Sequence, residues 1–130
     1  MKRALPRIAA VAFMVFFLAV CVIADRGEGS RWWGFLDHIP QGDKLGHVVL
    51  VGTMAFLCNL AIPTRPRAWL PRFITLTTFV LLVLLTLDEL SQAFIPTRTC
   101  DSFDWLANLV GLTLGQTAAA VLCKVLRRES

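Results

Sequence analysis

Four long apolar segments, separated by shorter polar stretches, divide the chain. They cover residues 8–24, 45–62, 73–87 with an extension toward residue 94, and 103–126. A helix needs about 20 predominantly apolar residues to cross a bilayer, and tilt or flanking residues compensate for a small shortfall. We expect Pro96 to stop the third helix, because proline cannot continue the hydrogen-bond ladder. The pattern predicts an all-α protein in which residues 1–130 form a single membrane domain of four transmembrane helices.

Composition agrees with a bilayer environment. The chain has 130 residues, of which 56% are hydrophobic and only 17% are charged, with a mean hydropathy of +0.65. These values are too apolar for an ordinary soluble domain of this length. The net charge of +4 does not indicate a nucleic-acid binder, because the basic residues form small clusters between apolar runs and no continuous basic face.

The charged residues alternate between the connections in a way that predicts topology. Eight of the nine acids lie in or beside the first and third connections, whereas nine of the thirteen cations lie at the termini and in the second connection: Lys2, Arg3, Arg7, Arg65, Arg67, Arg72, Lys124, Arg127 and Arg128. Under the positive-inside rule both termini are cytoplasmic and the acidic connections are outside. We therefore predict a multi-pass protein of the cytoplasmic (inner) cell membrane.

The first apolar segment also fits a cleavable signal peptide. Basic residues precede its apolar core, and the small residue Ala24 stands before Asp25. We favour retention of this segment as the first helix.

Residues 88–108 concentrate ionisable and amide side chains between two apolar segments. Ionisable groups at membrane depth are costly and mark functional sites. Glu89 and Gln92 share a helix face at a spacing of three residues, and the rise of 1.5 Å per residue places Glu89 and Asn108 at a similar depth near the outer surface. His47 enters the membrane edge at that depth. We expect these side chains to share one layer.

Asp43 precedes His47 by one helical turn, so both lie on one face. We expect Asp43 to be the N-cap of the second helix, where its carboxylate accepts first-turn N–H groups. On the fourth helix a stripe runs from Asp104 and Asn108 to Gly111 and Gly115. The two glycines form a small-xxx-small pattern, which predicts close packing against the second or third helix.

The ordered set of motifs resembles the VanZ-like membrane family. The resemblance covers about residues 43–115. It is carried by Asp43-Lys44 with His47, Glu89-Leu-Ser-Gln92, Ile95-Pro96, Arg98, and Asp101/Ser102 followed by Asp104-Trp-Leu-Ala-Asn108 with Gly111 and Gly115. It implies a small multi-helix envelope protein, and the family takes its name from a protein associated with resistance to the glycopeptide teicoplanin. The family's polar positions fall on Asp43, Lys44, His47, Glu89, Gln92, Arg98, Asp104 and Asn108. Thr97, where glycine is expected, and Asp88 beside Glu89 depart from the pattern.

Two classes of function follow for these residues. In the binding class, Lys44 and Arg98 hold a phosphate or carboxylate of a lipid-linked envelope precursor, since arginine suits bidentate anion recognition. In the enzyme class, His47 is a general base or nucleophile with Glu89 as its partner, acting on a lipid-linked phosphate. A metal held by Asp43, His47 and Glu89 has suitable ligands but no diagnostic spacing, so no metal site is predicted. Neither a cofactor nor an oligomeric state is indicated.

A structural alternative needs no ligand. Buried acids and bases in membranes pair with one another, and Glu89 with Arg98 or His47 forms such an interhelical polar clamp.

Overall fold

The computed structural model describes residues 4–64, 68 and 70–128, and within them it contains helices and no strand. The elements in chain order are α1 (Ala4–Asp25), α2 (Gly29–Trp33), a 3₁₀ turn η1 (Gly34–His38), α3 (Gly42–Ala61), α4 (Leu76–Gln92) and α5 (Ser102–Arg128). The prediction of an all-helical fold is confirmed, and each of the four apolar segments coincides with a long helix. The short helices α2 and η1 were not predicted.

Two helix starts differ from the predictions. The N-cap of α3 is Gln41, in the left-handed region at φ 56°, so the assignment of Asp43 as the N-cap is wrong. Asp43 lies in the first turn, where its charge still complements the helix dipole. Helix α4 begins at Leu76 rather than at Phe73 because Thr75 caps it, its hydroxyl accepting from the Thr78 N–H at 3.1 Å.

Three helices, α1, α3 and α5, are long and apolar enough to cross a membrane. Helix α4 has 17 residues, which corresponds to about 26 Å at 1.5 Å per residue. That is a few ångströms less than the hydrocarbon core of about 30 Å. Length therefore supports α1, α3 and α5 as spans directly, whereas α4 is too short for length alone to identify it as a fourth.

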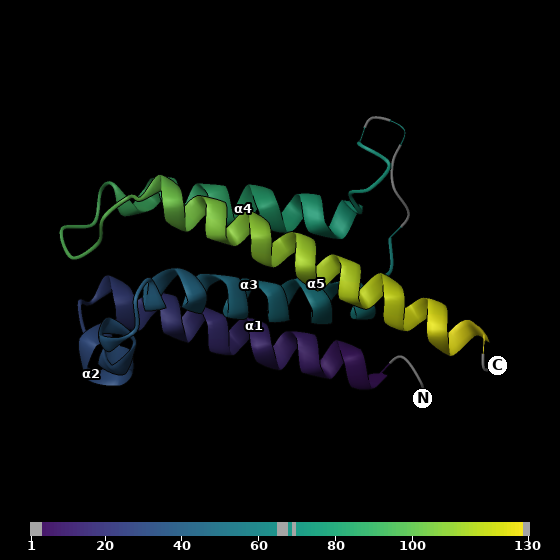
Figure 1. The fold of residues 1–130 in the computed structure, drawn as a ribbon, viewed down its shortest axis with the longest axis horizontal. Helices are drawn as coiled ribbons and strands as arrows, with labels where there is room; N and C mark the ends of the chain where they lie inside the picture. The colour runs from purple at the N-terminus through teal and green to yellow at the C-terminus, as the bar shows by residue number, and fades with distance from the viewer. Residues whose placement is uncertain (1–3, 65–67, 69, 129–130) are drawn as a thin grey trace.

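The four long helices form an elongated bundle in which α3 and α5 run in parallel (Figure 1). The start of α1 and the end of α5 lie at one end of the bundle, and the α4–α5 connection and α2 lie at the other. We call this second end, where α3 begins, α4 ends and α5 begins, the polar end. Helices α3 and α5 share the largest interface, α4 contacts both, and α1 packs mainly on α3.

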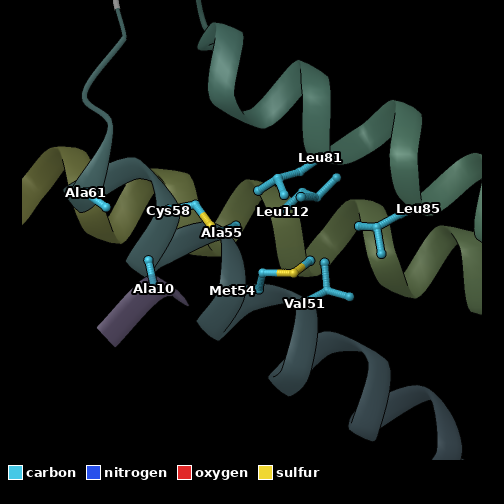
Figure 2. Packing of buried hydrophobic residues seen from close by; sticks show 9 residues of the cluster. All are labelled: Ala10, Val51, Met54, Ala55, Cys58, Ala61, Leu81, Leu85 and Leu112. Carbon is cyan, nitrogen blue, oxygen red and sulfur yellow. The ribbon is translucent and has the colours of Figure 1, made fainter. Parts of the chain in front are cut away.

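The interior of the bundle is small and is centred on α3. Figure 2 shows its buried side chains, to which α3 contributes the majority, α1 only Ala10, and α4 Leu81 and Leu85. Large apolar side chains face outward instead, as Leu18 of α1 and Leu114 of α5 do with 56% and 57% of their surface exposed. This inverted distribution suits a protein surrounded by hydrocarbon.

Gly111 and Gly115 lie where α5 meets α3. A Cβ added to Gly115 would collide with the carbonyl oxygen of Gly52 and would lie 2.8 Å from Cβ of Ala55. A Cβ on Gly111 would lie 2.9 Å from the carbonyl oxygen of Val48. Only glycine allows the two backbones to approach so closely, and this approach fixes the register of the polar residues one and two turns before it.

Candidate functional site

The polar end brings together most of the side chains singled out by the sequence. Lys44 of α3 donates through Nζ to Asp43 at 2.7 Å, to Asp104 at 3.1 Å and to Asp101 at 3.3 Å. The Lys44 side chain is 27% exposed and that of Asp104 only 14%. The Lys44 ammonium therefore contacts three carboxylates, whose negative charges already neutralise its positive charge.

His47 lies one turn deeper and contacts α5 through both ring nitrogens. Its Nδ1 is 3.0 Å from Oδ1 of Asn108, and its Nε2 is 3.7 Å from Oδ2 of Asp104. Asn108 is buried, with 4% of its surface exposed. The prediction that Glu89 is the partner of His47 is wrong, because Asn108 and Asp104 take that role.

Glu89 and Gln92 are buried where α4 meets the start of α5, at 4% and 2% exposure. Oε1 of Glu89 accepts the backbone N–H of Asp101 at 2.9 Å, and Oε2 lies 3.4 Å from Nε2 of Gln92. The same Gln92 amide donates to Asp88 at 3.2 Å. Both neighbouring acids therefore contact Gln92, as their spacing allows.

Arg98 lies apart from these residues. Its Nη1 donates to Oδ1 of Asp25, at the end of α1, at 2.9 Å, so the expected pairing of Arg98 with Glu89 is wrong. Thr97, one of the departures from the family pattern, donates its hydroxyl to the carbonyl oxygen of Asp25 at 2.5 Å. These two contacts fasten the α4–α5 connection to α1.

Asp101 links the parts of the site. It belongs to the motif that carries the family resemblance, but it was not among the predicted site residues. It precedes the first residue of α5, and its Oδ1 accepts the N–H of Phe103 at 2.8 Å, which is the geometry of an N-cap. Its Oδ2 contacts Lys44, and its own N–H reaches Glu89. An acid immediately before a helix was the only sequence signal for this role. We refer to Lys44, His47, Glu89, Asp101, Asp104 and Asn108 as the polar cluster.

The environment of Asp101 predicts an acid-dependent contribution to stability. The Phe103 N–H, and then Lys44, lower the pKa of the Asp101 carboxyl below its ordinary value. A lowered pKa stabilises the fold above the ordinary value of about 3.9, and this contribution is lost as pH falls through the folded-state pKa. The difference in melting temperature between the wild type and Asp101→Asn, in which asparagine keeps the cap, should therefore be present at pH 7 and shrink below about pH 4. A difference that stays constant down to pH 3 would contradict this assignment.

A partly open pocket of about 200 Å³ lies beside the polar cluster, between the end of α4 and the start of α5. Its lining residues are Thr86, Glu89, Leu90, Cys100, Ser102 and Trp105. Two of these lining residues bond each other, since the indole N–H of Trp105 donates to the Thr86 hydroxyl at 3.0 Å. Leu90 at the rim is 56% exposed, so the pocket opens on the apolar surface of the bundle.

A second polar group, absent from the predicted site, lies near the opposite end. The Thr75 hydroxyl donates to Oδ1 of Asn59 at 2.6 Å, the Asn59 amide donates to Thr78 at 3.0 Å, and the Thr75 N–H donates to Gln116 at 3.0 Å. These neutral contacts tie the start of α4 to α3 and α5. An asparagine and a glutamine inside apolar segments were the available signal.

Within the described residues, no group of three His, Cys, Asp or Glu side chains is arranged to hold a metal ion. Asp43 contacts Lys44 at 2.7 Å, and Glu89 contacts the backbone of Asp101. The structure gives no support to a metal held by Asp43, His47 and Glu89.

Fold and site together define a bundle of apolar, membrane-type helices that carries a hydrogen-bonded polar cluster at one end. The family model for VanZ/LLP1 matches residues 8–126, and the chain therefore belongs to the VanZ family. The matched range is wider than residues 43–115, which carry the motifs, and it includes most of α1. Searches of the curated proteins and of the solved structures found no significant match.

Proposed function

We propose that this protein spans the cell membrane four times, with both termini in the cytoplasm and the polar end outside. The distribution of charges supports this topology. Arg7 lies near the start of α1, Arg72 shortly before α4, and Lys124, Arg127 and Arg128 near the end of α5, and these helix ends lie together at the end of the bundle opposite the polar end (Figure 1). Helix α4 is included because polar contacts join its start to α3 and α5 and its second half to α5, which makes it part of the same bundle. A short span is accommodated by local thinning of the bilayer.

Reporter fusions test this topology. Fusions after Arg31 and after Cys100 should report the outer compartment, and a fusion after Arg67, which lies outside the described residues, should report the cytoplasm. A cytoplasmic signal after Cys100 would contradict the proposed outer location of the polar cluster.

N-terminal sequencing of the purified protein tests whether cleavage after Ala24 removes α1. We expect retention, because Asp25 holds Arg98 and because α1 packs on α3.

For the polar cluster we propose a binding function: it holds the phosphate or carboxylate group of a lipid-linked envelope precursor at the outer membrane surface. The observation that carries this proposal is the convergence of a lysine, a histidine and buried carboxylate and amide groups, one of which, Glu89, also lines a partly open pocket. A lipid can present its headgroup there while its chains remain in the bilayer. Tolerance of glycopeptides such as teicoplanin is the cellular effect that family membership suggests.

Charge places a condition on this proposal. Lys44 contacts three carboxylates and Arg98 contacts a fourth. An anionic ligand must therefore displace a carboxylate from one of these cations. Lys44 is the better candidate, because it lies in the polar cluster, whereas Arg98 lies beside α1.

The contacts of His47 favour binding over catalysis. Nδ1 lies 3.0 Å from the amide oxygen of Asn108, which can only accept, so the lone pair of a neutral ring is on Nε2. A general base needs that lone pair directed at its substrate, but Nε2 faces the Asp104 carboxylate at 3.7 Å. Acid–base chemistry on a lipid-linked phosphate would require Asp104 to move away from Nε2. The enzyme hypothesis consequently receives less support than the binding hypothesis.

Retention of lipid by the purified protein tests the binding proposal. After extraction in a mild detergent, native mass spectrometry should detect phosphate-bearing lipid on the wild type and little or none on Lys44→Met. The matched control is Lys124→Met, which removes a lysine near the other end of the molecule and should leave retention unchanged. Equal retention by all three proteins would argue against the proposed site.

A further inference from the structure

Asp101 interacts with the polar cluster in the way that a ligand would. Its carboxylate contacts the Lys44 ammonium at 3.3 Å, and its backbone N–H donates to Oε1 of Glu89 at 2.9 Å. One residue therefore presents an anionic group and a neighbouring hydrogen-bond donor to two different helices. Both contacts come from the connection that precedes α5, and neither belongs to the helix packing itself.

We infer that Asp101 is an internal stand-in for the ligand, and that the ligand carries an anionic oxygen with an N–H or O–H donor close to it. This inference rests on the proposed binding function and names the headgroup chemistry that the site selects. A molecule that takes the place of the whole residue, carboxylate and backbone N–H together, must also satisfy Glu89. A buried carboxylate that loses a donor without replacement is destabilised, so an anion without a donor is disfavoured.

The surroundings of Asp101 are compatible with this exchange. The adjoining pocket of about 200 Å³ is lined by Glu89, Cys100 and Ser102, and it is smaller than the 300–1,000 Å³ of typical whole-ligand pockets. It therefore suits a headgroup fragment rather than a complete lipid. Lys44 is 27% exposed and Asp101 35% exposed, so the contact between them is accessible to solvent.

The connection that carries Asp101 is fastened at a second point. Arg98 and Thr97 bind Asp25 at the end of α1, three and four residues before Asp101. Displacement of Asp101 requires this connection to shift, and the Arg98–Asp25 ion pair opposes that shift. Weakening the pair should therefore favour ligand binding even though Arg98 does not contact the polar cluster.

Two phospholipids form a matched pair of probes. Phosphatidylethanolamine and phosphatidylcholine are both zwitterionic phosphates, but only the ethanolamine headgroup has N–H donors. In titrations of the detergent-solubilised full-length protein with short-chain forms, followed by native mass spectrometry, the wild type should bind phosphatidylethanolamine about fivefold or more tightly than phosphatidylcholine. Glu89→Gln should reduce this ratio toward one, since a neutral acceptor binds an ammonium less strongly than a carboxylate does.

Removal of the stand-in should strengthen binding. Asp101→Asn keeps the cap on Phe103 but releases Lys44, so its affinity for phosphatidylethanolamine should rise about threefold to fivefold, as expected for loss of one partly exposed competing ion pair. Arg98→Gln should change affinity in the same direction and serves as a second variant if Asp101→Asn folds poorly. The control Arg31→Gln removes an exposed arginine outside the polar cluster and should have no effect.

Separate outcomes test the inference and the function on which it rests. If lipid binding depends on Lys44 but is unchanged in Asp101→Asn and Arg98→Gln, or if the two phospholipids bind equally, the inference is wrong and the binding function stands. If no phospholipid binds to the wild type or to any variant, both are wrong.

Discussion

Replacement of Gly115 by leucine is expected to abolish most of the folded protein. Any Cβ at this position collides with the α3 backbone at Gly52 and comes within 2.9 Å of the Phe56 N–H nitrogen. Neither group is a flexible side chain that can move aside. Overpacking of a well-packed interface costs about 1–3 kcal/mol, and a backbone collision should reach or exceed the upper value. The yield of monodisperse protein in detergent and its melting temperature measure the effect.

Gly111→Leu should have a similar effect, because a Cβ there lies 2.9 Å from the Val48 carbonyl oxygen. The control is Thr113→Leu on the exposed face of α5, where the threonine hydroxyl bonds only the Leu109 carbonyl of its own helix. It should be tolerated. If all three variants gave the same yield and melting temperature, the glycines would have no special role in packing.

Lys44→Met is the second substitution with a large expected effect. It leaves Asp104, whose side chain is only 14% exposed, without its cation and next to the carboxylate of Asp101. The loss of a charge-assisted hydrogen bond to a largely buried carboxylate costs about 2 kcal/mol. A lower melting temperature is therefore expected for Lys44→Met, with Lys124→Met as the control that should melt like the wild type.

A second substitution should reverse much of this loss. Asp104→Asn in the Lys44→Met background removes the stranded charge and leaves an amide that can still face His47. Replacing both members of a buried charge pair is often close to neutral, whereas removing one member is costly. A double variant as unstable as Lys44→Met would mean that the pair does not account for the stability of this region.

The helices could be predicted from the sequence because their signals are local and strong. Each apolar run overlaps one long helix, and the ends of the helix differ by a few residues from the ends of the run. The differences arise from capping chemistry: Gln41 in a left-handed conformation begins α3, and the Thr75 hydroxyl begins α4. Such caps depend on the local backbone conformation rather than on hydrophobic periodicity.

The site was only partly predictable, because helix spacing defines faces but does not choose partners across helices. The stripe from Asp104 to Gly115 on α5 was predicted from its spacing. In the structure this stripe packs against α3, where Asp104 contacts Lys44 and Asn108 contacts His47. The partner of Arg98 could not be predicted from helix spacing, because that partner, Asp25, lies on α1, far away in the sequence. Asp101 was missed because its role combines a backbone N–H with a side chain, and sequence patterns do not show backbone donors.

The structure also sharpens the choice between a clamp and a binding site. Within the described residues, every buried side-chain nitrogen and oxygen has a hydrogen-bond partner, as a structural clamp requires. Lys44, His47 and Asp101 nevertheless remain 27%, 26% and 35% exposed, and Glu89 of the same cluster lines an open pocket. A clamp needs neither this exposure nor a pocket, and a binding site needs both.

Lipid retention by the folded Lys44→Met/Asp104→Asn double variant tests the central claim most directly. Its melting temperature should be close to that of the wild type, so any loss of binding cannot be attributed to unfolding. We predict that native mass spectrometry will detect phosphate-bearing lipid on the wild type and little on the equally folded double variant. Equal amounts of retained lipid on the two proteins would contradict the binding site and leave the polar cluster as a structural clamp.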